Sequence, residues 1–111
     1  MSELADHKCD SCDTATQPVA TPEADKLLRE LGNGWRIVDG HHLEKAYEFK
    51  DFKQALAFTN KVGEVAELVG HHPDIFLTWG KVRIEIFTHK VKGLTKDDFI
   101  LAAKFERAKG R

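Results

Sequence analysis

The sequence predicts an α+β domain in which helices pack on one face of a four-stranded antiparallel sheet. Three observations carry this prediction: apolar residues recur every three or four positions in three segments, they form short apolar or alternating runs in four others, and short turn signals separate paired strands. The order is α-β-β-α-β-β-α. Paired hairpins separated by helices are typical of this class.

Length and composition limit the kind of protein this is. The chain has 111 residues, enough for one domain with one hydrophobic core. Its 17 basic and 18 acidic residues give a net charge of -1, which argues against a broad basic surface for nucleic acid. No apolar run approaches the ~20 residues of a membrane span, and no secretion signal is apparent. We therefore expect a cytoplasmic protein that binds neither membrane nor nucleic acid.

The chain begins with a polar segment followed by a helix. Residues 1–20 are rich in Asp, Ser, Thr and Cys and are expected to form a flexible or loosely docked arm, so the domain itself spans 21–111. Thr21 is a suitable N-cap, and Pro22 suits the first helical position. The glycine-rich segment 32–34 ends this helix.

A hairpin and a long helix come next. The apolar segment 35–38 and the alternating segment 42–49 flank Asp39 and Gly40, a hairpin turn signal. A second helix, capped by an acidic residue at its start, is predicted to run to about Val69, because apolar residues recur along it at helical spacing.

The second hairpin and the last helix complete the domain. Apolar residues alternate over 75–79 and again over 82–89, with Gly80 at the turn. A loop over 90–94 leads to Thr95, which opens the last helix. Four strands leave two sheet edges, and exposed edges invite pairing with another copy. We therefore predict a homodimer or homotetramer.

Histidine is unusually frequent, with six residues in the chain. His71 and His72 lie between the long helix and the second hairpin, and His89 ends the last strand. Antiparallel pairing brings the two ends of that hairpin together, so the three imidazoles are predicted to converge. Converging imidazoles suit proton transfer near neutral pH or the binding of a metal ion. A solvated surface pair is the alternative.

Two further expectations concern a glutamate near His71 and the second histidine pair. Glu67 lies four residues before His71 at the end of a predicted helix and is expected to orient or charge-stabilise that imidazole. His41 and His42 follow a turn signal and are expected to serve the hairpin rather than a functional site.

Several of these residues carry a resemblance to a known family. They are Glu67, His71-His72-Pro73, Trp79, Thr88-His89, Gly93-Leu94-Thr95 and Asp98, with Leu43-Glu44-Lys45, Phe49, Phe52 and Ala55 to Phe58 upstream. In this pattern the chain resembles the pterin-4a-carbinolamine dehydratase family, over roughly residues 21–104. The resemblance implies a hydro-lyase that converts 4a-hydroxytetrahydropterin to quinonoid dihydropterin. It implies a functional link to phenylalanine hydroxylase, whose pterin cofactor the reaction recycles, and it implies no metal or organic cofactor.

The resemblance also implies roles for particular residues. His71, His72 and His89 are implied as catalytic, with His72 and His89 expected to be the acid–base pair. Substrate contacts are implied for Gly70, Pro73, Trp79, Thr88 and Lys90. Supporting roles are implied for Glu67 and Asp98.

Two of these assignments have a structural alternative. Trp79 is either a wall of the pterin site or a core aromatic on the face of Ile75 and Leu77. Asp98 follows Thr95 at the spacing of a helix capping box, which would by itself explain an acidic residue there. Many family members carry an acid directly before the histidine pair, where this chain has Gly70.

The N-terminal arm raises the question of a metal. His7, Cys9 and Cys12 offer at most three local ligands, whereas structural zinc takes four. We expect no metal in the arm, with a shared zinc site or a redox pair as the alternatives. Two other functions remain open for the whole chain: a non-catalytic dimerisation or binding module on the same scaffold, and a histidine-bound metal protein.

Overall fold

The computed structural model describes residues 19–88, 91 and 93–109. Its elements follow the predicted order: α1 (Thr21–Leu31), β1 (Arg36–Val38), β2 (His42–Glu48), α2 (Phe52–Val69), β3 (Asp74–Leu77), β4 (Lys81–Ile86) and α3 (Lys96–Lys109). The predicted α+β class is confirmed. The expected arm falls almost wholly outside the described residues.

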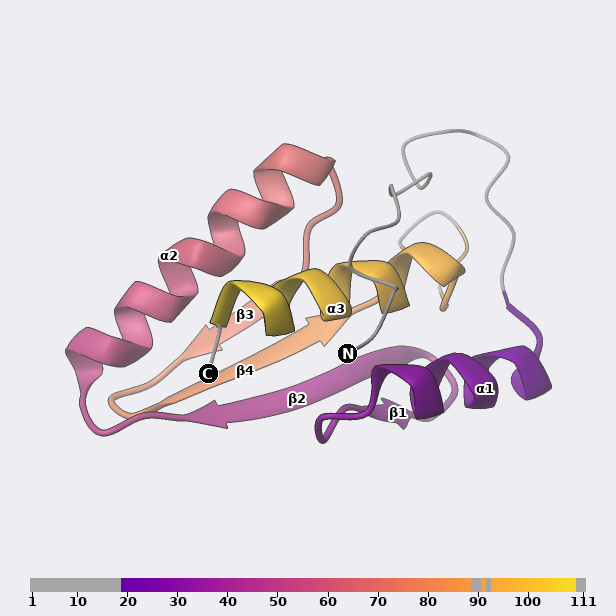
Figure 1. Cartoon of the computed structure of the whole chain (residues 1–111), viewed down its shortest axis with the longest axis horizontal. Helices are drawn as coiled ribbons and strands as arrows, with labels where there is room; N and C mark the ends of the chain where they lie inside the picture. Colours follow the sequence, from indigo (N-terminus) through magenta and orange to yellow (C-terminus); the bar gives the residue numbers. More distant parts are fainter. Residues whose placement is uncertain (1–18, 89–90, 92, 110–111) are drawn as a thin grey trace.

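The four strands form one antiparallel sheet in the order β1-β2-β4-β3. The two hairpins pair as predicted, and they join where β4 lies against β2. The edges of the sheet are therefore β1 and β3. Figure 1 shows all three helices on one face of this sheet, with α3 in the middle.

Local sequence signals explain most of the element ends. Asp39 and Gly40 have φ values of 55° and 64°, the left-handed pair of a type I′ hairpin turn. Asp51 caps α2 by accepting a hydrogen bond from the Gln54 backbone N–H at 2.9 Å. The N-cap of α1 is Ala20 rather than Thr21, because Ala20 is the last residue with an extended backbone.

The last strand is shorter than the alternation predicts. It ends at Ile86, and Thr88 forms an isolated antiparallel bridge with Gly93 instead. The Thr88 backbone N–H donates to the Gly93 carbonyl at 2.8 Å. Thr88 and Gly93 therefore lie side by side directly after β4, and Thr88 also contacts Thr95 and Asp98 at the start of α3.

The core lies between the sheet and the helices. Alternate strand residues face the helices and are buried, as period-2 patterning requires: Leu43, Tyr47, Val82, Ile84 and Ile86. Helix α3 packs against both α1 and α2 and is buried along much of its length, through Phe99, Ile100, Leu101, Ala102, Ala103 and Phe105. Asp97 and Asp98 enter the interior with its first turn.

A second polar group ties α3 to the sheet near the other end of the helix. Glu106 accepts hydrogen bonds from the Trp35 indole N–H at 3.0 Å, the Lys45 ammonium at 2.7 Å and the Tyr47 hydroxyl. Burial and the Glu106 carboxylate raise the pKa of the Tyr47 phenol far above its ordinary value of 10.0. Tyr47 is thus held as a neutral donor.

The membrane prediction is consistent with the described residues. None of the helices there is both long enough and apolar enough to cross a bilayer.

Candidate functional site

The end of α2 sets the position of the histidine pair. Gly70 takes the left-handed conformation, with φ 72° and ψ 25°, and its N–H donates to the Ala66 carbonyl at 2.9 Å. Glycine adopts this conformation without the penalty that a β-carbon adds. The helix therefore stops at Val69, and the chain turns so that the next residue, His71, points inward.

His71 is buried and is held by Asp98. The His71 residue is 8% exposed, and Asp98 is 0% exposed. His71 Nε2 lies 2.6 Å from Asp98 Oδ1. Since an ionised carboxylate only accepts hydrogen bonds, this contact assigns the proton to Nε2. In the neutral imidazole, Nδ1 is then the ring nitrogen without a proton.

The second oxygen of Asp98 serves the neighbouring loop and helix. Asp98 Oδ2 accepts from the Thr95 backbone N–H at 2.7 Å and from the Thr88 hydroxyl at 2.9 Å. The Thr95 hydroxyl lies 2.9 Å from Thr88 Oγ1. Asp98 therefore joins three segments: the loop after α2, the loop after β4 and the first turn of α3.

The two ends of the second hairpin lie together, with Asp74 paired to Glu85, while the convergence of the three imidazoles stays a prediction. Through Asp98, Thr88 and His71 belong to one hydrogen-bonded cluster, which we call the Asp98 cluster (His71, Thr88, Thr95 and Asp98). His89 and Lys90, which directly follow Thr88, lie outside the described residues. Their predicted roles stay predictions.

His72 differs from His71 in both exposure and partner. Its side chain is 59% exposed, and its Nε2 lies 2.5 Å from Glu67 Oε2. The expectation that Glu67 orients His71 is wrong, because the turn at Gly70 sends His71 into the interior and leaves His72 over the last turn of α2. Pro73 follows half-buried and leads into β3.

The two explanations for Asp98 hold together. As in a capping box, the carboxylate of the third helical residue reaches back to the backbone N–H of the residue before the helix, Thr95. The same carboxylate binds His71 through its other oxygen. Capping alone would not require a histidine at that oxygen. The contact between the Thr88 and Thr95 hydroxyls was not predicted, because it depends on the loop after β4.

Two predicted substrate contacts are not placed as expected. Trp79 lies in the β3–β4 turn, at the end of the hairpin opposite to the histidine pair, and it is 68% exposed. Within one chain it is neither a wall of the site nor a core aromatic. The Thr88 backbone N–H is bound to Gly93, and its carbonyl accepts from Val91 and Gly93, so neither group is left open for a pterin edge.

The arm residues named as the alternative zinc ligands are not described. His7, Cys9 and Cys12 all lie outside the described residues. Among those residues, the group of side chains with a metal-like arrangement contains His42, Glu44 and Glu85, on the sheet face away from the helices. The alternation of His42 and Glu44 on one strand is the sequence signal for the first two members of this group.

Fold and site together define a class: a small helix-backed four-stranded α+β domain with a histidine pair and a buried carboxylate at one end of its sheet. The family model for pterin 4 alpha carbinolamine dehydratase matches residues 17–108. The chain belongs to this family.

Relatives and solved structures agree with this assignment. Relatives from Alkaliphilus metalliredigens and Rubrobacter xylanophilus, both provisionally named pterin-4-alpha-carbinolamine dehydratases, are 45% and 48% identical over 107 residues. These matches cover 96% of this chain and 96% and 99% of the relatives. A crystal structure from Brucella melitensis, described as a transcriptional coactivator/pterin dehydratase, has a TM-score of 0.79 at 32% identity and covers 85% of this chain and 100% of that one.

A more distant structure shares the fold alone. A pterin dehydratase-like protein, described as a RuBisCO assembly factor in the alpha-carboxysome, matches with a TM-score of 0.60 at 22% identity. The match covers 72% of this chain and 94% of the other chain.

Proposed function

We propose that this protein dehydrates 4a-hydroxytetrahydropterin to quinonoid dihydropterin by histidine acid–base catalysis. The observation that carries the proposal is the Asp98 cluster. It fixes His71 next to the exposed His72, and its member Thr88 directly precedes His89 in the sequence. Family membership supplies the substrate class. In this proposal the reaction recycles the pterin cofactor of an aromatic amino acid hydroxylase.

The reaction needs one proton donor and one proton acceptor. The C4a–oxygen bond breaks as an acid delivers a proton, so that the oxygen leaves as water. A base removes the N5 proton, and the N5–H electron pair forms the N5=C4a bond. Imidazoles perform both steps near neutral pH, and a positioned acid or base contributes roughly 10²–10⁴-fold. The chemistry is complete without an organic cofactor or a metal, so we expect neither.

The contacts of the histidines support different roles for them. His72 is exposed, and its Nδ1 makes no hydrogen bond to any described residue, so it suits proton exchange with a bound substrate. His71 is buried with Nε2 committed to Asp98, which suits orientation of a substrate through Nδ1. We assign the acid–base pair to His72 and His89, with Pro73 and Lys90 beside the substrate.

The test is stopped-flow absorbance of chemically generated 4a-hydroxytetrahydropterin. We expect His72→Ala and His89→Ala each to lower kcat by roughly 10²–10⁴-fold. Two glutamate variants on α2 test the ion pair between Glu67 and His72. Glu67→Gln should lower kcat, while Glu64→Gln, about one turn earlier on the same helix, should not. Decay at the wild-type rate in both histidine variants would refute the proposal.

A binding function is the second candidate. It is favoured by the similar structure from Brucella melitensis, whose description pairs a coactivator role with pterin dehydratase. The same stopped-flow assay separates the two candidates, because a purely binding protein would show no turnover with an intact Asp98 cluster.

We also propose that the protein works as a dimer or tetramer. Leu68 on α2 is 86% exposed, and an open groove runs beside it to Ile75 on the edge strand β3. Isolated leucines are common on surfaces, but one beside a groove and an edge strand of the described sheet suits contact with a second copy. Light scattering that gives a monomer mass at every concentration of a dilution series would refute this.

A further inference from the structure

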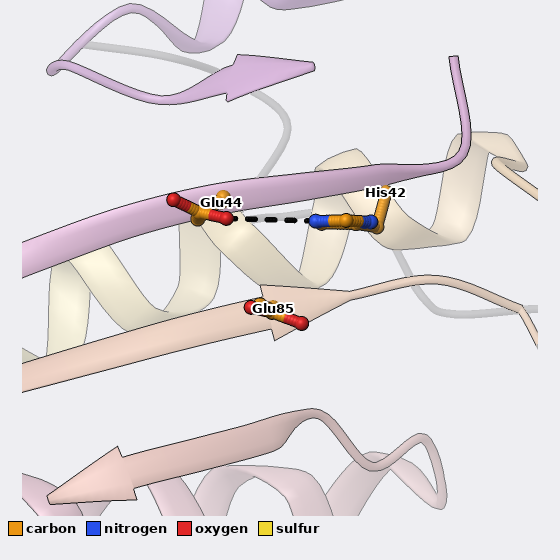
Figure 2. A group of neighbouring side chains, drawn as sticks. All are labelled: His42, Glu44 and Glu85. Atoms are coloured by element: carbon orange, nitrogen blue, oxygen red, sulfur yellow. Dashed lines mark ion pairs between the residues drawn. The ribbon is translucent and has the colours of Figure 1, made fainter. Parts of the chain in front are cut away.

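We propose that His42, Glu44 and Glu85 form a binding site for a divalent transition-metal ion, represented by Zn²⁺, on the sheet face away from the helices. Glu44 and Glu85 are directly opposite each other on β2 and β4, and His42 is two residues before Glu44 on the same face. Figure 2 shows the three side chains on these neighbouring strands, with the His42 ring lying toward Glu44. Their ligand atoms lie within 4.8 Å of one another.

The spacing is close to what the ion requires. With Zn–N and Zn–O distances of about 2.0–2.2 Å, two ligands of a tetrahedral ion are roughly 3.3–3.6 Å apart. His42 Nε2 and Glu44 Oε1 are already 3.5 Å apart. Closing the site therefore requires the Glu85 carboxylate to move toward His42 and Glu44, and a fourth position is left for water.

The His42 ring carries an unsatisfied atom that points to a ligand. Nε2 is buried and makes no hydrogen bond among the described residues, with Glu44 Oε1 3.5 Å away in an ion-pair contact, whereas buried polar atoms are almost always hydrogen-bonded. Its other nitrogen, Nδ1, lies 3.2 Å from His41 Nδ1. If His42 Nδ1–H donates to His41, the lone pair of Nε2 is directed at two carboxylates, and a cation between them satisfies all three groups.

Each of the two carboxylates has one oxygen bound by an arginine. Glu44 Oε2 lies 2.6 Å from Arg36 Nη2, and Glu85 Oε2 lies 3.3 Å from Arg83 Nε. Each ligand thus has one polar atom held by an outer partner and one left for the ion, which is how outer residues orient metal ligands in proteins.

The charges on this face also favour a cation. Glu44, Glu85 and Asp74 are consecutive cross-strand neighbours on β2, β4 and β3. Like charges directly opposite in a sheet destabilise it, and the two arginines offset only part of this row. The nitrogen ligand favours a transition metal such as Zn²⁺ over Mg²⁺ or Ca²⁺, which prefer oxygen alone.

The test measures zinc binding by equilibrium dialysis with elemental analysis. It uses the full-length, tag-free chain with Cys9→Ser and Cys12→Ser, so that no thiolate contributes. We expect one zinc per chain, and a loss of affinity of at least tenfold in His42→Ala and in Glu85→Gln, which keeps the side-chain shape. Glu48→Gln is the matched control, because Glu48 lies on the same strand and face outside the group, and it should bind as the parent does.

A second readout separates this site from the other histidines. The ¹⁵N resonance of His42 Nε2 should shift on zinc addition, and His72→Ala should retain the bound zinc. The proposal is overturned if no saturable zinc binding occurs at micromolar concentration, or if affinity is unchanged in both His42→Ala and Glu85→Gln. Neither readout depends on dehydratase turnover.

Discussion

Replacing Asp98 by asparagine is the sharpest test of the Asp98 cluster. The substitution keeps the shape of the side chain but turns one acceptor oxygen into an NH₂ donor. Three donors, from Thr88 and Thr95 on one side and His71 on the other, now compete for the single remaining oxygen. The threonine side supplies two of them, including the backbone N–H, so we expect the amide NH₂ to face His71.

The magnitude follows from one lost charge-assisted hydrogen bond. Such bonds contribute about 1.5–3 kcal/mol, and part is regained if His71 moves its proton from Nε2 to Nδ1 and accepts from the amide. A net loss of about 1–3 kcal/mol is expected. For 111 residues with an unfolding entropy of about 2.1 cal/mol/K each, this lowers Tm by about 4–13 °C.

The assay combines thermal unfolding with ¹⁵N NMR of the imidazole. Wild type should show the Nε2–H form of His71, and Asp98→Asn the Nδ1–H form, with kcat reduced because the wrong nitrogen meets the substrate. Asp51→Asn is the control, since asparagine caps a helix as well as aspartate does and Asp51 caps α2 through the Gln54 N–H, away from the histidines. An Asp98→Asn protein with unchanged Tm and unchanged His71 tautomer would refute the assignment.

Three further predictions concern stability. Glu106→Gln should lower the free energy of unfolding by about 1–3 kcal/mol in urea titration, because three donors lose a charged acceptor. Gly70→Ala should cost roughly 1–2 kcal/mol because its φ is 72°, while Gly63→Ala, inside the same helix with open space at its β-carbon, should be neutral or stabilising. Arg36→Gln should cost about 0.2–1 kcal/mol at pH 7. Since Arg36 lowers the pKa of Glu44, that difference should be present above pH 4.5 and vanish as pH falls through the folded-state pKa, and a difference that persists at low pH would contradict it.

Local signals were enough to predict the order of the elements, whereas the contacts that join distant segments were missed because they are non-local. The cap of α2 and the Asp39–Gly40 turn depend on residues within a few positions, so the sequence determines them directly. The partner of His71 lies 27 residues away on α3, and its geometry depends on how the helix packs on the sheet. Which strand lies beside β2 is equally non-local. Hairpin signals pair β3 with β4 but do not say that β4, and not β3, adjoins β2, so the Glu44–Glu85 contact could not be predicted.

The end of β4 connects the Asp98 cluster to the zinc site proposed on the opposite face. Because β4 is paired on both sides, by β2 and β3, its C-terminal end is among the best-fixed parts of the sheet. Alternation then sends Glu85 to the open face, while Thr88, just past the strand, is tied into the Asp98 cluster. Between them, the Phe87 ring packs 4.6 Å from the ring of His41, which contacts His42. A substitution at Phe87 should therefore disturb zinc binding and dehydratase activity together, whereas Glu85→Gln, with its side chain on the open face, should affect zinc binding alone.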